Sequence, residues 1–250
     1  MREWYSIKNE ADTVEILIYG VIGEDYWGDG VSAAKFAQDL SSVRNVQTIN
    51  ARINSVGGNV MEGTAIYNTL VNHSAAINII IDGWAISAAS FIAMAGAGEG
   101  NSITMAENGM MMIHKPWAGS VGTADDLRKT AEMMDKAEVN IIKTYQSKVD
   151  KTDDELATMM AEETWMTGQE ALDHGFVDSL TGSANISNNA DNRIFNSYKN
   201  IPAGLMNLAP VKAELVSGAG IEVPVTGTFT LANGRSVGHL AKEIDLLEID

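Results

Sequence analysis

The fold of this chain is decided by the run Ile79-Ile80-Ile81-Asp82-Gly83-Trp84-Ala85-Ile86-Ser87-Ala88-Ala89-Ser90-Phe91-Ile92-Ala93-Met94-Ala95-Gly96. Its first part is an apolar strand pattern, and a helix rich in small residues is predicted from Ser87 onward. A serine at a strand-to-helix turn has unpaired helix-terminal N–H groups beside it, and these can stabilise an oxyanion. A serine among alanines is equally compatible with simple packing in a buried helix. The run alone leaves both interpretations open.

Strand and helix patterns alternate on either side of this run. We expect strands at 14–19, 48–54, 76–81, 102–105 and 110–114, and helices at 31–40, 60–72 and 87–97. A long helix is expected at about 124–148 and a shorter one at 153–162, with Thr152 as its N-cap. The β-α-β-α succession favours parallel pairing and a layered α/β fold.

The composition limits the class of protein. The 250 residues, 45% of them hydrophobic, suffice for one large domain with an appendage. The absence of cysteine excludes disulfides, thiolate catalysis and cysteine-ligated zinc. A net charge of −16 argues against nucleic-acid binding, which needs a basic face. The one apolar stretch of spanning length, 77–96, is interrupted by Asp82 and by the turn at Gly83, so no membrane helix is expected. We expect a soluble, cytoplasmic protein without metal or other cofactor.

Two further motifs accompany Ser87. The segment Ile53-Asn54-Ser55-Val56-Gly57-Gly58 ends a strand on a glycine pair, and Met111-Met112-Ile113-His114-Lys115-Pro116 ends another on a histidine. Together the three motifs resemble the Clp protease proteolytic subunit family, which carries a glycine-pair turn, a G-x-A-x-S nucleophile turn and an M-I-H-x-P strand end in this order. The resemblance runs from about residue 14 to residue 180. It implies a crotonase-like spiral of β-β-α units with a handle helix, and a serine peptidase.

The resemblance assigns the nucleophile, the general base and the oxyanion hole. Ser87 would be the nucleophile and His114 the general base, because a serine needs a group that takes its proton. The backbone N–H groups of Gly58 and Ala88 would form the oxyanion hole, since glycine allows both the turn and a close approach of substrate. Ser90 lies one helical turn after Ser87 and is expected to be a packing residue.

The third catalytic residue is expected at Glu163, in the segment Glu163-Thr164-Trp165. The family has an aspartate, one residue and an aromatic there, at the same distance from the histidine. A glutamate is one methylene longer, but either carboxylate can hold the imidazole in one tautomer. The neighbouring Glu162 is an alternative, and a site with no acidic third residue is another.

The chain departs from housekeeping Clp subunits in two places. Before its first matched strand it has a short lead, Glu3 to Asp12, in place of the amphipathic helix and axial loop that meet the unfoldase. After residue 181 it continues with a polar, Asn-rich linker. We therefore expect a peptidase domain at 1–181 and, at 182–250, a linker and a tail with a strand-like stretch at 221–231 and a helix-like one at 237–247. The tail is expected to be dispensable for folding and to be a site of self-processing.

These departures resemble the phage and prophage branch of the family, the head maturation proteases. The predicted function is a serine endopeptidase that cuts capsid or scaffold proteins in an assembling prohead. It would act as a homo-oligomeric ring, joined through its helices and a handle that includes Gly119–Leu127. Three alternatives stay open: a proteolytic subunit that works with an ATP-dependent unfoldase, a crotonase-fold enzyme acting on acyl-CoA thioesters, and an inactive scaffold or assembly protein.

Overall fold

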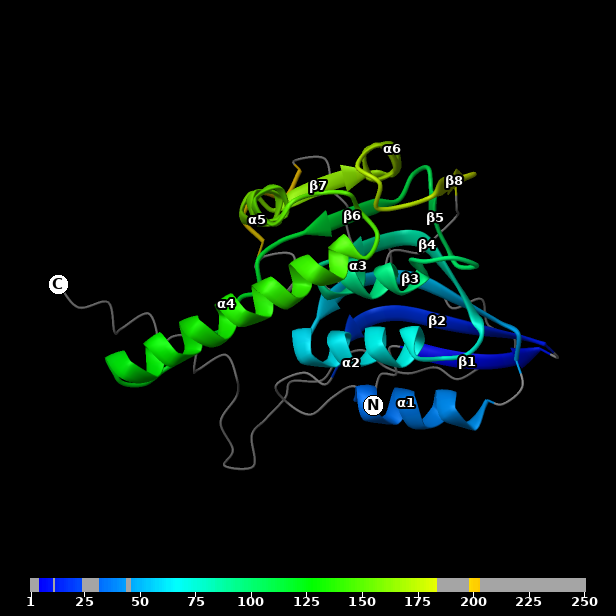
Figure 1. The fold of residues 1–250 in the computed structure, drawn as a ribbon, viewed down its shortest axis with the longest axis horizontal. Coiled ribbons are helices and arrows are strands. Elements are labelled where there is room, and N and C mark those ends of the chain that lie inside the picture. Colours follow the sequence, from blue (N-terminus) through cyan, green and yellow to red (C-terminus); the bar gives the residue numbers. More distant parts are fainter. Residues whose placement is uncertain (1–4, 11, 24–31, 44–45, 184–197, 203–250) are drawn as a thin grey trace, which may run out of the picture. The chain divides into compact units, whose positions relative to one another are not determined.

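The computed structural model describes residues 5–10, 12–23, 32–43, 46–183 and 198–202. In this part of the chain the strands form a single sheet that is lined by helices (Figure 1). The strands are β1 (Tyr5–Glu10), β2 (Thr13–Ile22), β3 (Thr48–Gly58), β4 (Ala76–Ile86), β5 (Ser102–Ala106), β6 (Met110–Ile113), β7 (Thr164–Thr167) and β8 (Ser179–Thr181). The helices are α1 (Ala33–Ser42), α2 (Val60–Val71), α3 (Ala88–Ala93), the 3₁₀ helix η1 (Met94–Gly96), α4 (Ala124–Gln146), α5 (Asp153–Ala161) and α6 (Gly168–Asp173).

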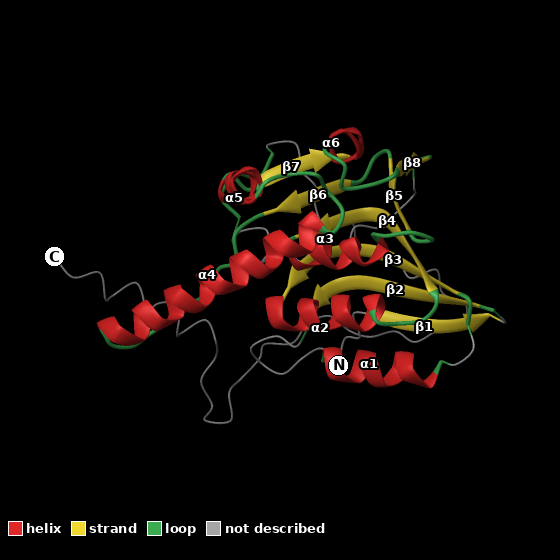
Figure 2. Ribbon diagram, in the orientation of Figure 1, coloured by secondary structure: helices red, strands yellow, loops and turns green. Residues whose placement is uncertain are grey.

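The sheet is mostly parallel, which confirms the predicted α/β fold. Its strand order is β1-β2-β3-β4-β5-β8, and β6 joins β4 away from this path. Among the described strands, the antiparallel pairs are β1 with β2 and β6 with β7. The helices α1, α2 and α3 lie next to one another across the sheet, in the order of strands β2, β3 and β4 (Figure 2).

Strand β4 changes partner in the middle, and this change creates the site. Its first half pairs with β5, from Asn78 to Ile81. Its second half pairs with β6, with Trp84 opposite Met110 and Ile86 opposite Met112. The sheet therefore divides at Asp82–Gly83, and the ends of β4 and β6 lie next to each other.

Asp82, the charged residue at this division of the sheet, is paired with neighbouring side chains. Asp82 is buried, and it pairs with the guanidinium of Arg52 on β3, whose Nε lies 2.8 Å from Asp82 Oδ2. The hydroxyl of Tyr19 on β2 donates to the same oxygen at 2.6 Å. Burial, followed by the hydrogen bond to Asp82, raises the pKa of Tyr19 to about 12, so this hydroxyl stays a donor. These contacts satisfy the carboxylate that interrupts the apolar run.

Two apolar clusters cover the two faces of the sheet. The larger one fills the space between the strands and the helices, and it includes Phe36, Leu70 and Ile92. The smaller one lies where β3, β4 and β6 end, and it is built from Val56, Trp84, Ile86, Met112 and Tyr198. Strands β3 and β4 alternate between buried and half-buried residues in their first halves and are buried on both faces in their second halves. The second halves are thus held on both sides.

Three expectations need correction or fall outside the described residues. The lead before residue 12 contains β1, which the sequence did not reveal because this strand has two apolar residues, Tyr5 and Ile7, too few for a clear alternation. Residues 115–123 contain no strand or helix, so the part of the expected handle that precedes α4 is irregular. The stretches at 221–231 and 237–247, and most of the linker, lie outside the described residues.

Helix α4 is anchored only at its C-terminal end. Ile141, Ile142 and Tyr145 are buried there, whereas Leu127 and Met133 nearer its start are exposed. The N-terminal half extends away from the sheet (Figure 1). This half therefore presents apolar side chains that the described part of the chain does not cover.

Candidate active site

Ser87 occupies a strained turn between β4 and α3. It is the N-cap of α3, with φ 55° and ψ −123°, so the helix begins at Ala88 and not at Ser87 as expected. Its own N–H donates to the carbonyl oxygen of Met112 at 2.9 Å. Non-glycine residues avoid positive φ at a cost of about 1–3 kcal/mol and persist there only where the surroundings hold them. The backbone of the serine is thus held by β6, the strand that leads to His114.

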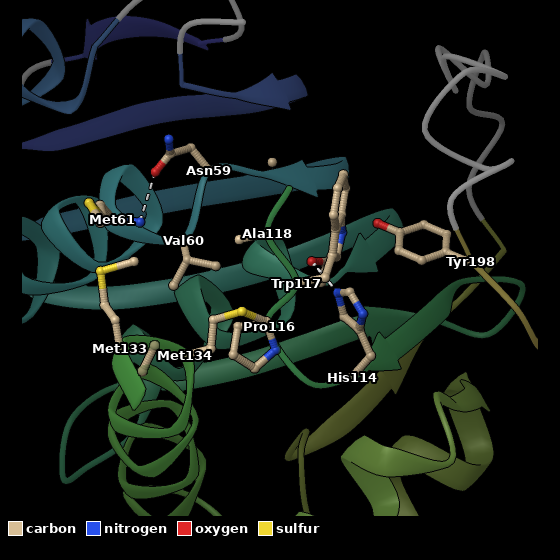
Figure 3. A pocket seen from close by; sticks show the side chains of 13 residues that line it. Asn59, Val60, Met61, His114, Pro116, Trp117, Ala118, Met133, Met134 and Tyr198 are labelled. Carbon is tan, nitrogen blue, oxygen red and sulfur yellow. Dashed lines mark hydrogen bonds between the residues drawn. The ribbon is translucent and has the colours of Figure 1, made fainter. Parts of the chain in front are cut away.

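The side chains of Ser87 and His114 meet. Ser87 Oγ lies 2.7 Å from His114 Nε2, and both residues line the same groove (Figure 3). The pairing of β4 with β6 explains this contact, because it places the two strand ends side by side. A serine hydroxyl that donates to Nε2 needs the other ring nitrogen to carry the proton. The geometry suits transfer of the Ser87 proton to His114.

Burial sets the basicity of His114. The side chain is largely buried, and this burial lowers the pKa of His114 below its ordinary value of 6.5. The negative charge of Glu163 opposes this effect and raises the pKa. Because burial is the larger effect, the imidazole stays neutral to a lower pH than an ordinary histidine. A neutral imidazole is the form that accepts the proton of a serine.

The glycine pair packs against two stretches of backbone, Gly57 against the Ser87 turn and Gly58 against the end of β2. Gly57 has φ 87° and Gly58 has φ 153°, both outside the range that other residues readily adopt. A β-carbon on Gly57 would lie 2.5 Å from the carbonyl oxygen of Ile86 and 2.9 Å from the nitrogen of Ala88. A β-carbon on Gly58 would lie 2.2 Å from the carbonyl oxygen of Ile22. Only glycine fits at either place.

Ser90 supports the turn from behind. It is fully buried, and its hydroxyl donates to the carbonyl oxygen of Ser87 at 2.6 Å. The hydroxyl of Tyr145 on α4 lies 2.7 Å from the same Ser90 oxygen. These contacts place Ser90 in the packing behind the turn, as expected, and they connect α4 to the turn.

Glu163 and Glu162 occupy different environments. Glu163 is half-buried, has φ 50° and lies close enough for its charge to act on His114. Its Oε2 accepts the backbone N–H groups of Lys199 and Asn200 at 2.7 and 2.8 Å. Glu162 is exposed, and its carbonyl oxygen accepts the side-chain amide of Asn200 at 3.0 Å. Ser87 and Glu163 are the two non-glycine residues with positive φ in the described part of the chain.

An open groove of about 410 Å³ leads to Ser87 (Figure 3). Gly58 and the start of α2 form one wall, and the side chain of Asn59 caps α2 by accepting the N–H of Met61 at 2.8 Å. The segment after His114, the middle of α4 and Tyr198 also line it. The lining is largely apolar: Val60, Met61, Pro116, Trp117, Met133 and Met134. The groove is therefore suited to an extended chain with apolar side chains.

Comparison with known proteins agrees with this geometry. The family model described as Clp protease matches residues 5–184. The chain belongs to the Clp protease family. Clp proteases are serine peptidases, so the chain is a hydrolase of peptide bonds.

Several relatives carry the corresponding names. ATP-dependent Clp protease proteolytic subunit 1 of Leifsonia xyli is 33% identical over 58% of this chain and 73% of its own length. ATP-dependent Clp protease proteolytic subunit of Bacteroides fragilis is 30% identical over 66% of this chain and 78% of its own length. ATP-dependent Clp protease proteolytic subunit 1 of Borreliella burgdorferi is 31% identical over 56% of this chain and 72% of its own length.

One residue of the site lies beyond the part that matches the Clp protease model. Tyr198 lines the groove beside Ser87 and His114, although the match ends at residue 184. It follows the Asn-rich linker and belongs to no motif, so sequence reasoning had no signal for it. Within the described residues, no group of three or more histidines and acidic residues could hold a metal ion. No helix there is both long and apolar enough to cross a membrane.

Proposed function

We propose that this Clp protease is an endopeptidase that cleaves through an acyl-enzyme on Ser87. The observation that carries the proposal is the 2.7 Å contact between Ser87 Oγ and His114 Nε2 at the wall of an open groove. Ser87 Oγ attacks the substrate carbonyl while His114 Nε2 takes the serine proton. The imidazolium then gives this proton to the leaving amine, and the C–N bond breaks. Water, activated by His114, hydrolyses the ester.

The oxyanion is assigned to two backbone donors, the N–H groups of Gly58 and Ala88. Ala88 is the first residue of α3, and N–H groups of a first helical turn have no acceptor within their helix. Gly58 lines the groove together with Ser87. Donors aimed at a developing negative charge are typically worth about 3 kcal/mol each in the transition state.

Glu163 is proposed as the third catalytic residue, after Ser87 and His114, because its negative charge raises the pKa of His114. We expect Glu163→Gln to lower kcat/KM by about 10²-fold, since the neutral amide no longer stabilises the imidazolium. The same change removes the charge that raises the pKa of His114, so the acid limb of the pH–rate profile should move to lower pH. A peptide substrate with an apolar side chain, assayed from acid to neutral pH, measures both effects.

The matched control is Glu162→Gln, which alters an exposed carboxylate one residue away. Its rate and pH profile should equal those of the unaltered chain. An impaired Glu162→Gln beside a normal Glu163→Gln would move the role to Glu162. Two normal variants would leave the site without an acidic third residue.

The biological setting is proposed to be the assembling prohead, with capsid or scaffold proteins as substrates. This proposal is supported by the resemblance to the phage branch and by a site segment, 198–202, that lies beyond the Clp protease match. A second setting, partnership with an ATP-dependent unfoldase, is favoured by the names of the relatives. Cleavage of purified capsid or scaffold protein without ATP would support the first setting. Activity that appears only with an unfoldase and ATP would support the second.

A homo-oligomeric ring is proposed through α4. Leu127 and Val139 are exposed on this helix, Val121 is exposed in the segment before it, and none of the three lines the groove. A second copy of the chain would bury these side chains and complete the handle. Sedimentation velocity measures the assembly, and a monomer at micromolar concentration at several salt concentrations would contradict it.

A further inference from the structure

The short segment 198–202 contacts the site through the side chain of Tyr198 and the backbone that follows it. Tyr198 is buried, and its ring stands edge-on to His114, with centroids 5.2 Å apart and planes at 89°. A similar contact joins it to Trp165, at 5.9 Å and 80°. The Tyr198 hydroxyl donates to the carbonyl oxygen of Val56 at 3.0 Å, immediately before the glycine pair. One side chain thus contacts the strand ends that carry the base and the glycine turn.

The backbone after Tyr198 holds the carboxylate of Glu163. The N–H groups of Lys199 and Asn200 both donate to Glu163 Oε2, and Glu163 itself has a strained φ of 50°. Two N–H donors to a carboxylate fix its direction and stabilise its charge. They occupy Oε2, which leaves Oε1 free of these two bonds.

The segment forms a wall and leaves the groove open. Tyr198 is among the residues that line the groove, and Ser87 and His114 line it as well. In Figure 3 the Tyr198 side chain lies beside His114, on the side opposite Met133 and Met134 of α4. Tyr198 is itself a buried member of the smaller apolar cluster, and the partly buried Ile201 packs at its edge. A segment that blocked the groove would cover the nucleophile, and this one does not.

We propose that residues 198–200 are a positioning element of the active site. Tyr198 holds the His114 ring and excludes water from it, while the two N–H groups hold Glu163 in place. The inference rests on the proposed catalytic roles of Ser87, His114 and Glu163. It also extends the catalytic unit beyond residue 181, where the sequence placed the end of the peptidase domain.

The proposal predicts a change in the pH dependence of activity, because burial is the largest effect on the pKa of His114 and lowers it. The groups that face this ring are Ser87, Glu163 and Tyr198, while the adjacent Lys115 pairs with Glu138 on α4 at 2.8 Å. Burial also raises the pKa of Tyr198 to about 12, so its hydroxyl stays neutral throughout an assay. Loss of the Tyr198 ring should hydrate the imidazole and raise its pKa.

The test uses the full chain with Tyr198→Ala. We expect the rate of Ser87 labelling by a fluorophosphonate to fall about 10- to 100-fold, the usual loss when a catalytic group is slightly misplaced. The acid limb of the pH–rate profile should move to higher pH, opposite to the shift expected for Glu163→Gln. Tyr198→Phe keeps the aromatic ring. It should therefore keep most of the labelling rate and leave the acid limb of the pH–rate profile where it is in the unaltered chain.

Ile201→Ala is the matched control within the same segment, because Ile201 packs on the apolar cluster and does not hold His114 or Glu163. It should leave the position of the acid limb unchanged even where thermal unfolding shows lower stability. The proposal would be overturned by a folded Tyr198→Ala chain in which Ser87 is labelled at the normal rate and the acid limb of the pH–rate profile is unmoved. A faster rate would overturn it as well, since the segment would then be inhibitory.

If Tyr198→Ala does not fold, Lys199→Pro is the alternative test. Proline at position 199 removes one N–H donor to Glu163 and keeps the side chain of Tyr198. Lys199→Ala retains that donor and is its control. Equal labelling rates for these two variants would overturn the role assigned to the N–H groups. A wild-type chain that does not label at Ser87 would instead contradict the proposed function itself.

Discussion

Ser87→Ala is expected to abolish peptide hydrolysis and fluorophosphonate labelling while the chain stays folded. Without the hydroxyl there is no atom to form the acyl-enzyme, so the rate should fall by several orders of magnitude, about 10⁶-fold. The fold survives because alanine keeps the β-carbon, and the N–H bond to Met112 and the Ser90 contact use the backbone of residue 87. Activity assays together with thermal unfolding measure both outcomes. Undiminished labelling would exclude Ser87 as the nucleophile.

Ser87→Gly is the companion variant. It lacks the same hydroxyl but relieves the φ of 55°, which glycine adopts without strain. It should be as inactive as Ser87→Ala and at least as stable. A lower stability of the glycine variant would mean that the turn holds no strain.

Gly57→Ala is expected to disable the site by displacing the nucleophile turn. The new β-carbon would lie 2.5 Å from the Ile86 carbonyl oxygen and 2.7 Å from the β-carbon of Ser87. Both are atoms of the turn, so the turn must move, and the φ of 87° adds its own strain. We expect a loss of about 3 kcal/mol in the free energy of unfolding and loss of Ser87 labelling. Denaturant unfolding and the labelling rate test this expectation.

Gly100→Ala is the matched control for Gly57→Ala. Gly100 has a similar φ of 81°, but a β-carbon there would meet nothing within 4 Å. It should cost about 1–2 kcal/mol of backbone strain and leave labelling intact. If the two variants behaved alike, contact with the turn would not be the reason for glycine at position 57.

The repeating strand and helix patterns were sufficient to predict most of the fold. Strands β3, β4 and β5 lie where apolar alternation placed them, because one buried face dictates that period. Both β3 and β4 run further than predicted, to Gly58 and Ile86. Their second halves are buried on both faces by the smaller cluster, so alternation stops there while the strand continues.

Only part of the candidate site could be predicted from the sequence. Ser87 and His114 stand in motifs, and the structure places their side chains in contact. The start of α3 was misjudged by one residue, because a positive φ at Ser87 depends on its bond to Met112 and not on helix propensity. Tyr198 was not foreseen. Its role arises from a contact between distant parts of the chain, and no local pattern encodes such a contact.

The bond between Tyr198 and Val56 spans 142 positions of the chain. During synthesis the N-terminal part of a protein emerges first, and contacts between distant positions form late. Ser87, His114 and Glu163 would therefore leave the ribosome before Tyr198, the residue proposed to position His114. A newly made chain would become a fully competent protease only after residues 198–200 have been synthesised and have docked on the sheet. Such timing would protect nascent chains nearby from premature cleavage.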